Sequence, residues 1–232
     1  MAMLAHNLIT EAFGKLRYEP TMKRIRAKRN GETLVDTTRA VLLWQPHHVV
    51  PAYAVPESDL VGGYEPGDDR PRLHDSLLAG YVVLDFDQFD AWFEEDDAIM
   101  AHPHDPFHRI DIRRSSRHVR VQRDGELLAE SSRPTILFET LMPPRFSVPA
   151  DDILAELRPT ETVTWCAYKG QAAYYSVVVG NGVVHDLAWT IPEPLVEGEG
   201  LEGLVSFFND QVDITLDGEL LATPTNPWST HD

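Results

Sequence analysis

One stretch of this chain occurs twice, and this repetition constrains the fold more than any other feature of the sequence. Residues 23–44 (KRIRAKRNGETLVDTTRAVLLW) align without a gap on residues 117–138 (RHVRVQRDGELLAESSRPTILF). After one deletion the match resumes, with PAYAVP at 51–56 against PRFSVP at 144–149. Because most aligned pairs keep their size and polarity, we interpret the chain as two copies of one module.

The two copies define the expected domains. Leucine, isoleucine and phenylalanine recur at helical spacing over Ala5–Leu16, which predicts a short helix before the first copy. Ile110-Asp-Ile112 resembles Val212-Asp-Ile214, so each copy is expected to end in such a strand. The expected segments are an N-terminal helical segment (1–22), a diverged first repeat (23–112), a second repeat (113–222) and a C-terminal tail (223–232).

Each copy contains the signal of a β-hairpin. Apolar and polar residues alternate on both sides of Asn30-Gly31 in the first copy and of Asp124-Gly125 in the second. These dipeptides favour type I′ turns because both residues tolerate positive φ angles. The prolines that follow each hairpin keep the next segment extended. Together these features predict a mainly β fold.

Composition and charge narrow the possible partners. The chain has 37 acidic and 20 basic residues, and its formal net charge of -17 repels phosphate backbones and anionic lipid surfaces. No apolar run approaches the roughly 20 residues that span a bilayer, and the first residues lack the pattern of a secretory signal. We therefore expect a cytoplasmic protein without nucleic-acid or membrane partners.

The second copy continues into three predicted strands. These strands are Thr162–Tyr168, Ala172–Val179 and Val183–Thr190. If Asn181-Gly182 forms the turn, pairing outward places Val178 opposite His185 and Tyr174 opposite Trp189. One face is then expected to carry Tyr174, Ser176, His185 and Trp189, and the other Tyr175, Val177, Asp186 and Ala188.

His185 and Asp186 are neighbours in one of these strands. Because neighbouring side chains of a strand point to opposite faces, the two are not expected to form an orienting pair. This weakens a Cys-His-Asp triad built on Cys166.

Cys166 is the single cysteine of the chain, which excludes an internal disulfide and a cysteine-cage zinc site. A nearby cation such as Lys169 can activate a thiol as a nucleophile, so Cys166 and Lys169 are the candidate catalytic residues. Alternatively, Cys166 is a small buried hydrophobe. Lys169 is either a solvated turn residue or a charge aimed at a carboxylate or phosphate.

Tyrosines and tryptophans gather around the same strands. They are either core residues or the walls of a pocket for a flat or charged ligand, because each joins an apolar ring to a polar group. Arg145 or Lys169 would anchor an anionic group of that ligand. The candidate ligand-binding residues are Arg145, Trp165, Tyr168, Gly170, Tyr174, His185, Asp186 and Trp189.

Three histidines occur close together at the end of the first copy. His102, His104 and His108 are weak candidates for metal ligands, since their spacing matches no standard metal motif. Pro103 and Pro106 hold the segment extended and scatter the side chains. No metal site is therefore expected, and the sequence contains no zinc-knuckle or nucleotide-binding motif that would name a cofactor.

The segment Cys166-Ala-Tyr-Lys-Gly170, the Tyr174-Tyr175 strand and the run beginning at His185-Asp186 (HDLAWTIPEP) resemble the DUF427 family. The pattern of that family is Cys-Pro-Tyr-Lys-Gly, a tyrosine strand and Asp-x-Ala-Trp, and Ala167 stands here in place of the usual proline. Phe138-Glu-Thr140 and the Pro-Pro-Arg triplet that ends at Arg145 are also similar to the family pattern.

The resemblance implies a fold and little about activity. It implies two tandem Mss4-like or β-tent repeats, mainly β, in which bent antiparallel sheets meet at an angle, with a short N-terminal helix. Some members of that fold group hold zinc through paired Cys-x-x-Cys knuckles, which this chain lacks. The family has carried a nucleotidyltransferase label, but the chain lacks a Gly-Ser pair followed by spaced aspartates to hold Mg²⁺.

Three functions remain open from the sequence. The first is binding of a small, anionic or aromatic molecule in an aromatic pocket of the second repeat. The second is an enzyme of the group-transfer type that uses Cys166 as nucleophile. The third is a non-catalytic interaction or scaffold protein.

Overall fold

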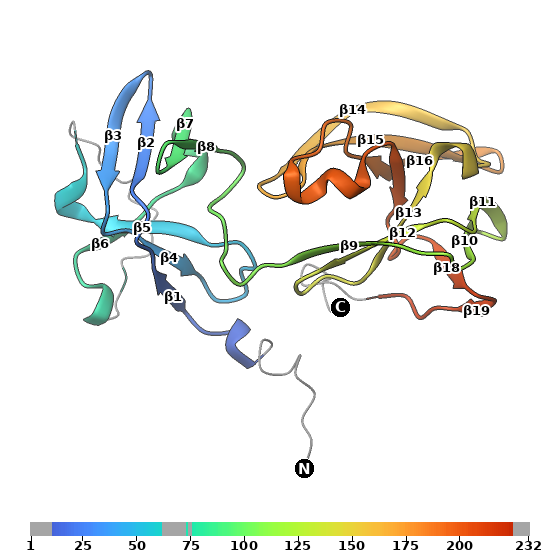
Figure 1. Cartoon of the computed structure of the whole chain (residues 1–232), viewed down its shortest axis with the longest axis horizontal. Helices are drawn as coiled ribbons and strands as arrows, with labels where there is room; N and C mark the ends of the chain where they lie inside the picture. Colours follow the sequence, from blue (N-terminus) through green and yellow to red (C-terminus); the bar gives the residue numbers. More distant parts are fainter. Residues whose placement is uncertain (1–10, 62–72, 74–75, 225–232) are drawn as a thin grey trace, which may run out of the picture. The chain divides into compact units, whose positions relative to one another are not determined.

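The computed structural model describes residues 11–61, 73 and 76–224, which belong to two compact units (Figure 1). The first unit spans Met1–Pro106 and the second Phe107–Asp232. Half of the expected helix over Ala5–Leu16 lies outside the described residues, and its described half is helical at residues 11–13. Strands dominate both units, as predicted.

In its described residues, the first unit contains two four-stranded antiparallel sheets. Its strands are β1 (Arg17–Pro20), β2 (Ile25–Arg29), β3 (Glu32–Thr37), β4 (Val41–Trp44), β5 (Ala52–Pro56), β6 (Tyr81–Val83), β7 (Ala91–Glu94) and β8 (Asp97–Ile99). The sheets have the orders β1-β4-β5-β6 and β3-β2-β7-β8. Three short 3-10 turns are η1 (Glu57–Asp59), η2 (Ser76–Leu78) and η3 (Phe86–Gln88).

The described part of the second unit also contains two antiparallel sheets, one of four strands and one of seven. Its strands are β9 (Ile110–Arg114), β10 (Val119–Arg123), β11 (Glu126–Ser131), β12 (Thr135–Glu139), β13 (Arg145–Pro149), β14 (Leu157–Cys166), β15 (Gly170–Val179), β16 (Gly182–Thr190), β17 (Leu204–Phe207), β18 (Asp213–Leu216) and β19 (Glu219–Leu220). The orders are β11-β10-β18-β19 and β14-β15-β16-β17-β13-β12-β9. The 3-10 turns are η4 (Ala150–Asp152) and η5 (Val196–Leu201).

The two units have the same order of strand pairings. The sheet β1-β4-β5-β6 corresponds to β9-β12-β13-β17, and β3-β2-β7-β8 corresponds to β11-β10-β18-β19. The second unit differs by β16, β15 and β14, which extend its larger sheet beyond β17. β9 pairs with β12, so the segment Ile110-Asp-Ile112 opens the second unit, and the expectation that it closes the first was wrong.

Both predicted hairpins are present. β2 pairs with β3 and β10 with β11, in each case with a bulge at the same place in the first strand. Asn30 and Asp124 both adopt a φ of 52°, and the glycine after each is also at positive φ, as a type I′ turn requires.

The β15–β16 hairpin has a different turn from the one expected. The turn lies at Gly180-Asn181, so Val178 faces Val183 and not His185. Gly180 has a φ of 55° at the first turn position, which is typical of a type II′ turn. A bulge farther along the hairpin then restores the predicted register at its other end.

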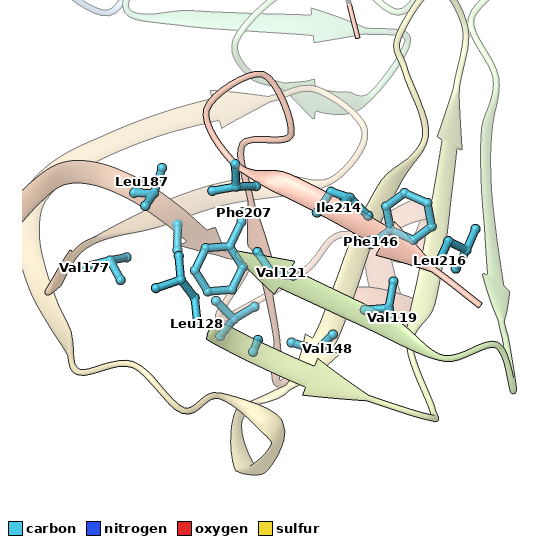
Figure 2. Packing of buried hydrophobic residues seen from close by; sticks show 14 of the residues in the cluster. Val119, Val121, Leu128, Phe146, Val148, Val177, Leu187, Phe207, Ile214 and Leu216 are labelled. Carbon is cyan, nitrogen blue, oxygen red and sulfur yellow. The ribbon is translucent and has the colours of Figure 1, made fainter. Parts of the chain in front are cut away.

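The main core of the second unit lies between its two sheets. Side chains from both sheets meet there, including Val121 of β10, Phe146 of β13 and Phe207 of β17 (Figure 2). Each such side chain contributes about 1.5–3 kcal/mol by leaving water. This core uses one face of the seven-stranded sheet, and the candidate site lies on the other.

None of the helical segments in the described residues has the length and the apolar character needed to cross a membrane.

Candidate functional site

The face of the seven-stranded sheet opposite the main core carries four of the predicted site residues: Arg145, Cys166, Tyr174 and Trp189. Residues paired directly across a sheet share a face, so the pairing places Leu137 with Arg145, and Trp189 with both Ser206 and Tyr174. We call this surface the motif face. Its members, strand by strand from β9 to β14, are Ile110, Ile112, Leu137, Glu139, Arg145, Ser147, Ser206, Trp189, Ala172, Tyr174, Thr164 and Cys166.

The turn between β14 and β15 is held by the segment that contains η5, which Figure 1 shows as an orange helix beside that turn. Leu195 donates its backbone N–H to the carbonyl of Lys169 at 3.0 Å. A Cβ atom on Gly198 would lie 2.8 Å from the same oxygen, so the two backbones touch. The Tyr-Lys-Gly motif is therefore held by the segment that contains η5 as well as by the β14–β15 hairpin.

A buried carboxylate, Glu139, lies at the end of β12. Lys169 Nζ donates to its Oε2 at 2.5 Å, and His108 Nε2 lies 3.0 Å from its Oε1. All three side chains are 10–12% exposed. Burial raises the pKa of Glu139, but the hydrogen bond from His108 and the charge of Lys169 outweigh it and lower the pKa to about 2. We call His108, Glu139 and Lys169 the Glu139 cluster.

Arg145 is a second buried charge on the motif face. Its side chain is 8% exposed, Nη1 donates to Asn209 Oδ1 at 3.0 Å, and the same nitrogen lies 3.6 Å from Asp210. The guanidinium lies over the ring of Phe208, 5.6 Å from the ring centre. Burial lowers the pKa of Arg145 from its ordinary value, although Asp210 and Glu139 oppose this by their charge.

The two candidate catalytic residues, Lys169 and Cys166, differ in their contacts. Lys169 is half of an ion pair with Glu139, so its charge is directed at that carboxylate. Cys166 ends β14 on the motif face and is partly buried. Within the described residues, no hydrogen bond or ion pair joins Cys166 to a base.

The predicted aromatic residues fall into two groups. Tyr174 faces Trp189 as predicted and stacks on Phe208, with 6.1 Å between ring centres. Tyr168 is buried and stacks on the ring of His108 at 4.5 Å. Trp165, next to Cys166 along β14, points to the opposite face of the sheet and is half exposed. The structure therefore places Tyr174 and Trp189 on the same face of the sheet as Arg145, and it leaves Trp165 outside the motif face.

His185 and Asp186 contradict the expectation that they point apart. Asp186 has a φ of 50° at the bulge, and its Oδ1 lies 3.4 Å from His185 Nδ1. Thr160 and Thr162 of β14 each donate to the Asp186 carboxylate at 2.7 Å and lower its pKa. Asp186 thus joins β16 to β14. His185 beside it is exposed to solvent, with 79% of its side chain accessible.

The three histidines near the unit boundary have separate partners. His102 contacts the carbonyl of Pro103, and His108 belongs to the Glu139 cluster. His104 donates its backbone N–H to Glu94, a buried carboxylate of the first unit. The described part of the chain contains no group of three histidine, cysteine or acidic residues that could hold a metal ion.

Glu94 resembles Glu139 in its surroundings. It accepts a hydrogen bond from the Tyr53 hydroxyl at 2.6 Å and forms an ion pair with Lys23. Burial raises its pKa, but the hydrogen bonds from His104, Lys23 and Tyr53 lower it to about 2.

Sequence reasoning missed the central role of Glu139 and the contribution of Phe208 and Asn209. Glu139 belongs to the Phe138-Glu-Thr140 segment that resembles the family pattern, and this was the available signal. Phe208 and Asn209 follow β17 and carry no local motif.

The sequence comparisons identify a domain in the second unit. No curated protein matches the chain. Residues 111–218, which hold β10 to β18 together with Glu139, Arg145 and Lys169, match the sequence model described as domain of unknown function (DUF427). The second unit therefore carries a region that matches the DUF427 family model.

Proposed function

We propose that the second unit binds a small anionic molecule on the motif face, with Arg145 as its charged anchor. The observation that carries this proposal is a buried guanidinium whose hydrogen bond to Asn209 and ion pair with Asp210 are both made through Nη1. Burying a cation costs free energy, and such groups commonly serve binding or catalysis. A guanidinium presents five N–H donors in a plane, which suits a carboxylate or a phosphate.

The surroundings of Arg145 favour a ligand with a flat apolar part. Phe208 lies against the guanidinium, and Tyr174 stacks on Phe208. Trp189 lies on the same face and pairs with Tyr174 across the sheet. Lys169 is less suited to be the anchor because Glu139 already neutralises it. An aromatic carboxylate or phosphate combines both required parts.

Three matched probes test this proposal: benzoate, phenyl phosphate and neutral benzamide. Benzoate or phenyl phosphate is expected to raise the melting temperature of the full chain more than benzamide does. Arg145→Met is expected to remove that difference, because it keeps the apolar stem and loses the charge. Arg113→Met, which alters an exposed arginine of β9, is the control and keeps the response.

Two results would contradict the proposal that Arg145 anchors the ligand. One is an Arg145→Met variant, folded by circular dichroism, that responds to both anions as the wild type does. The other is a stronger response to benzamide than to either anion. A Cys166→Ser variant separates binding from group transfer, since binding at Arg145 does not require the thiol.

We also infer that the two units derive from one duplicated module. The order of pairings, the bulge in the first hairpin strand and the turn φ angles agree between the units. A polar cluster agrees as well: Thr37 donates to Asp59 at 2.6 Å, and Ser131 donates to Asp152 at 2.6 Å. Arg39 and Arg133 complete the two clusters as ion-pair partners of these aspartates. Shared side-chain contacts support common descent more than fold alone does.

This inference predicts equal effects at equivalent positions. Asp59→Ala and Asp152→Ala each leave a threonine or serine hydroxyl and an arginine without their acceptor. Each is expected to reduce local stability by about 1 kcal/mol, the usual worth of such hydrogen bonds. Hydrogen exchange of the β2–β3 and β10–β11 hairpins measures this, each variant loosening the hairpin of its own unit. A large effect in one unit and none in the other would contradict equivalence.

A further inference from the structure

The sequence contains two Asn-Gly dipeptides, Asn30-Gly31 between β2 and β3 and Asn181-Gly182 at the turn between β15 and β16. In such a dipeptide the backbone nitrogen of the glycine can attack the side-chain amide carbon of the asparagine. A bond forms between this nitrogen and Cγ, the side-chain amide leaves as ammonia, and a cyclic succinimide results. Water then opens the ring to aspartate or isoaspartate. Because the two dipeptides share this chemistry, their turns decide which one reacts.

Gly31 is a central residue of its turn. β2 and β3 close on the pair of Arg29 and Glu32, which leaves Asn30 and Gly31 as the two turn residues. In the described part of the chain, Asp90 accepts a hydrogen bond from the Asn30 N–H, whereas the Gly31 N–H donates none. Both turn residues are exposed, and a Cβ atom on Gly31 would meet no atom within 4 Å. The attacking nitrogen is therefore free, and the turn has room to adopt the ring-closing geometry.

Gly182 belongs to the ladder of its hairpin. β15 and β16 close on the pair of Val179 and Gly182, and Gly180 and Asn181 form the turn. In a two-residue hairpin turn the residue after the turn donates its N–H to the carbonyl of the residue before it, here Gly182 to Val179. Glu126 holds the same turn by accepting a hydrogen bond from the Gly180 N–H. Attack by the Gly182 nitrogen therefore requires this end of the hairpin to open first.

We propose that Asn30 is a site of spontaneous deamidation, which releases ammonia, consumes one water molecule and leaves aspartate or isoaspartate in the β2–β3 turn. Asn181 is protected from the same reaction by the register of its hairpin. One backbone hydrogen bond shifts an opening equilibrium about fivefold, so Asn181 reacts about fivefold more slowly or less. The reaction needs no ligand and is independent of binding at Arg145.

The two products differ in their effect on the turn. Asp124 occupies the position of Asn30 in the second unit and has the same φ of 52°, so the aspartate product keeps the turn. Isoaspartate routes the backbone through its side chain and adds one methylene group to the turn. The lengthened turn no longer fits the closing pair, and the β2–β3 hairpin loosens. Either product also adds a negative charge next to Asp90.

Peptide mass spectrometry of the full chain tests the proposal after incubation at mildly alkaline pH, which favours loss of the proton from the attacking nitrogen. Asn30 is expected to convert about fivefold faster than Asn181, or more. An isoaspartate-specific methyltransferase with a labelled methyl donor identifies isoaspartate in the Asn30 peptide. The same incubation in concentrated urea is the control. There the two asparagines should react at similar rates, because the unfolded chain holds neither turn.

Two variants separate the reaction from the fold. Asn30→Asp removes the amide and reproduces the turn of the second unit. Ammonia release at this position should stop, and hydrogen exchange of the β2–β3 hairpin should stay as in the wild type. Asn181→Asp is the matched control and should leave the rate at Asn30 unchanged.

Three results would overturn the proposal. One is an Asn30 peptide that stays unmodified in the folded chain while both asparagines react in urea. Another is an equal rate at Asn30 and Asn181 in the folded chain. The third is a difference that persists unchanged in urea, because it would then come from the neighbouring residues and not from the turns.

Discussion

Replacing Glu139 with glutamine is expected to lower the free energy of unfolding by about 3 kcal/mol at neutral pH, the usual cost of removing one partner of a buried ion pair. Lys169 and His108 point at this carboxylate from inside the protein, and both side chains are nearly buried. Without the carboxylate, the Lys169 ammonium stays out of water and loses its counter-charge. Urea unfolding of the full chain, followed by tryptophan fluorescence, measures the loss.

The effect should depend on pH in a defined direction. The pKa of Glu139 falls from its ordinary 4.5 to about 2 on folding, so the folded protein favours the ionised form. The resulting stabilisation is fully present above pH 4.5 and is lost as the pH falls toward 2. The stability difference between wild type and Glu139→Gln should therefore shrink over this range. Comparing the two proteins at each pH cancels the similar contribution of Glu94.

Two further variants make the Glu139 prediction specific. Glu156→Gln removes an exposed acidic residue of the same unit and should change stability by less than about 0.5 kcal/mol. The double variant Glu139→Gln/Lys169→Met should recover much of the loss, because it removes the uncompensated charge together with its partner. If the double variant is less stable than Glu139→Gln by the full cost of Lys169→Met alone, the two residues are not coupled.

Gly170→Ala is the second large effect that we expect, a loss of about 3 kcal/mol from backbone strain and close contact combined. Gly170 has a φ of 103°, which L side chains rarely adopt. A Cβ atom there would lie 3.0 Å from the Glu193 carbonyl oxygen and 3.3 Å from the Leu195 backbone nitrogen. Neither backbone atom can move without loosening the segment that holds the motif turn. Thermal or urea unfolding reports the loss.

Gly203→Ala is the matched control for this change. Gly203 also has a positive φ, 70°, but a Cβ there meets no atom within 4 Å. It should cost only the conformational strain, about 1 kcal/mol. Equal losses in the two variants would show that contact with Glu193 and Leu195 contributes nothing.

The sequence predicted local structure well wherever a turn residue defined it. Asn30-Gly31 and Asp124-Gly125 identify their turns because few other residues tolerate such φ angles. The triplet Gly180-Asn181-Gly182 offered two possible turns, and each gives a different register. Alternation alone could not choose between them, and it could not reveal the bulge at Asp186.

The candidate site was only partly predictable because its charges meet through the fold. Lys169 was a visible candidate, but its partner Glu139 lies 30 residues earlier. His108 also comes from outside the motif, from the segment before β9. The ion-pair partner of a charged residue cannot be predicted from local sequence when the two residues meet only through the topology of the fold. The motif around Cys166 thus favoured the thiol as the reactive group. In the structure, Lys169 of the same motif forms an ion pair with Glu139.

The three added strands of the second unit show where this fold accepts new chain. Along the chain, β14, β15 and β16 lie between β13 and β17. In the sheet they lie beyond β17, so the order of all other pairings remains as in the first unit. The connection from β5 to β6 is the same junction in the first unit. That junction is therefore a suitable place to graft additional strands. A hairpin transplanted there from one unit to the other would lengthen a sheet without changing the connectivity of the other strands.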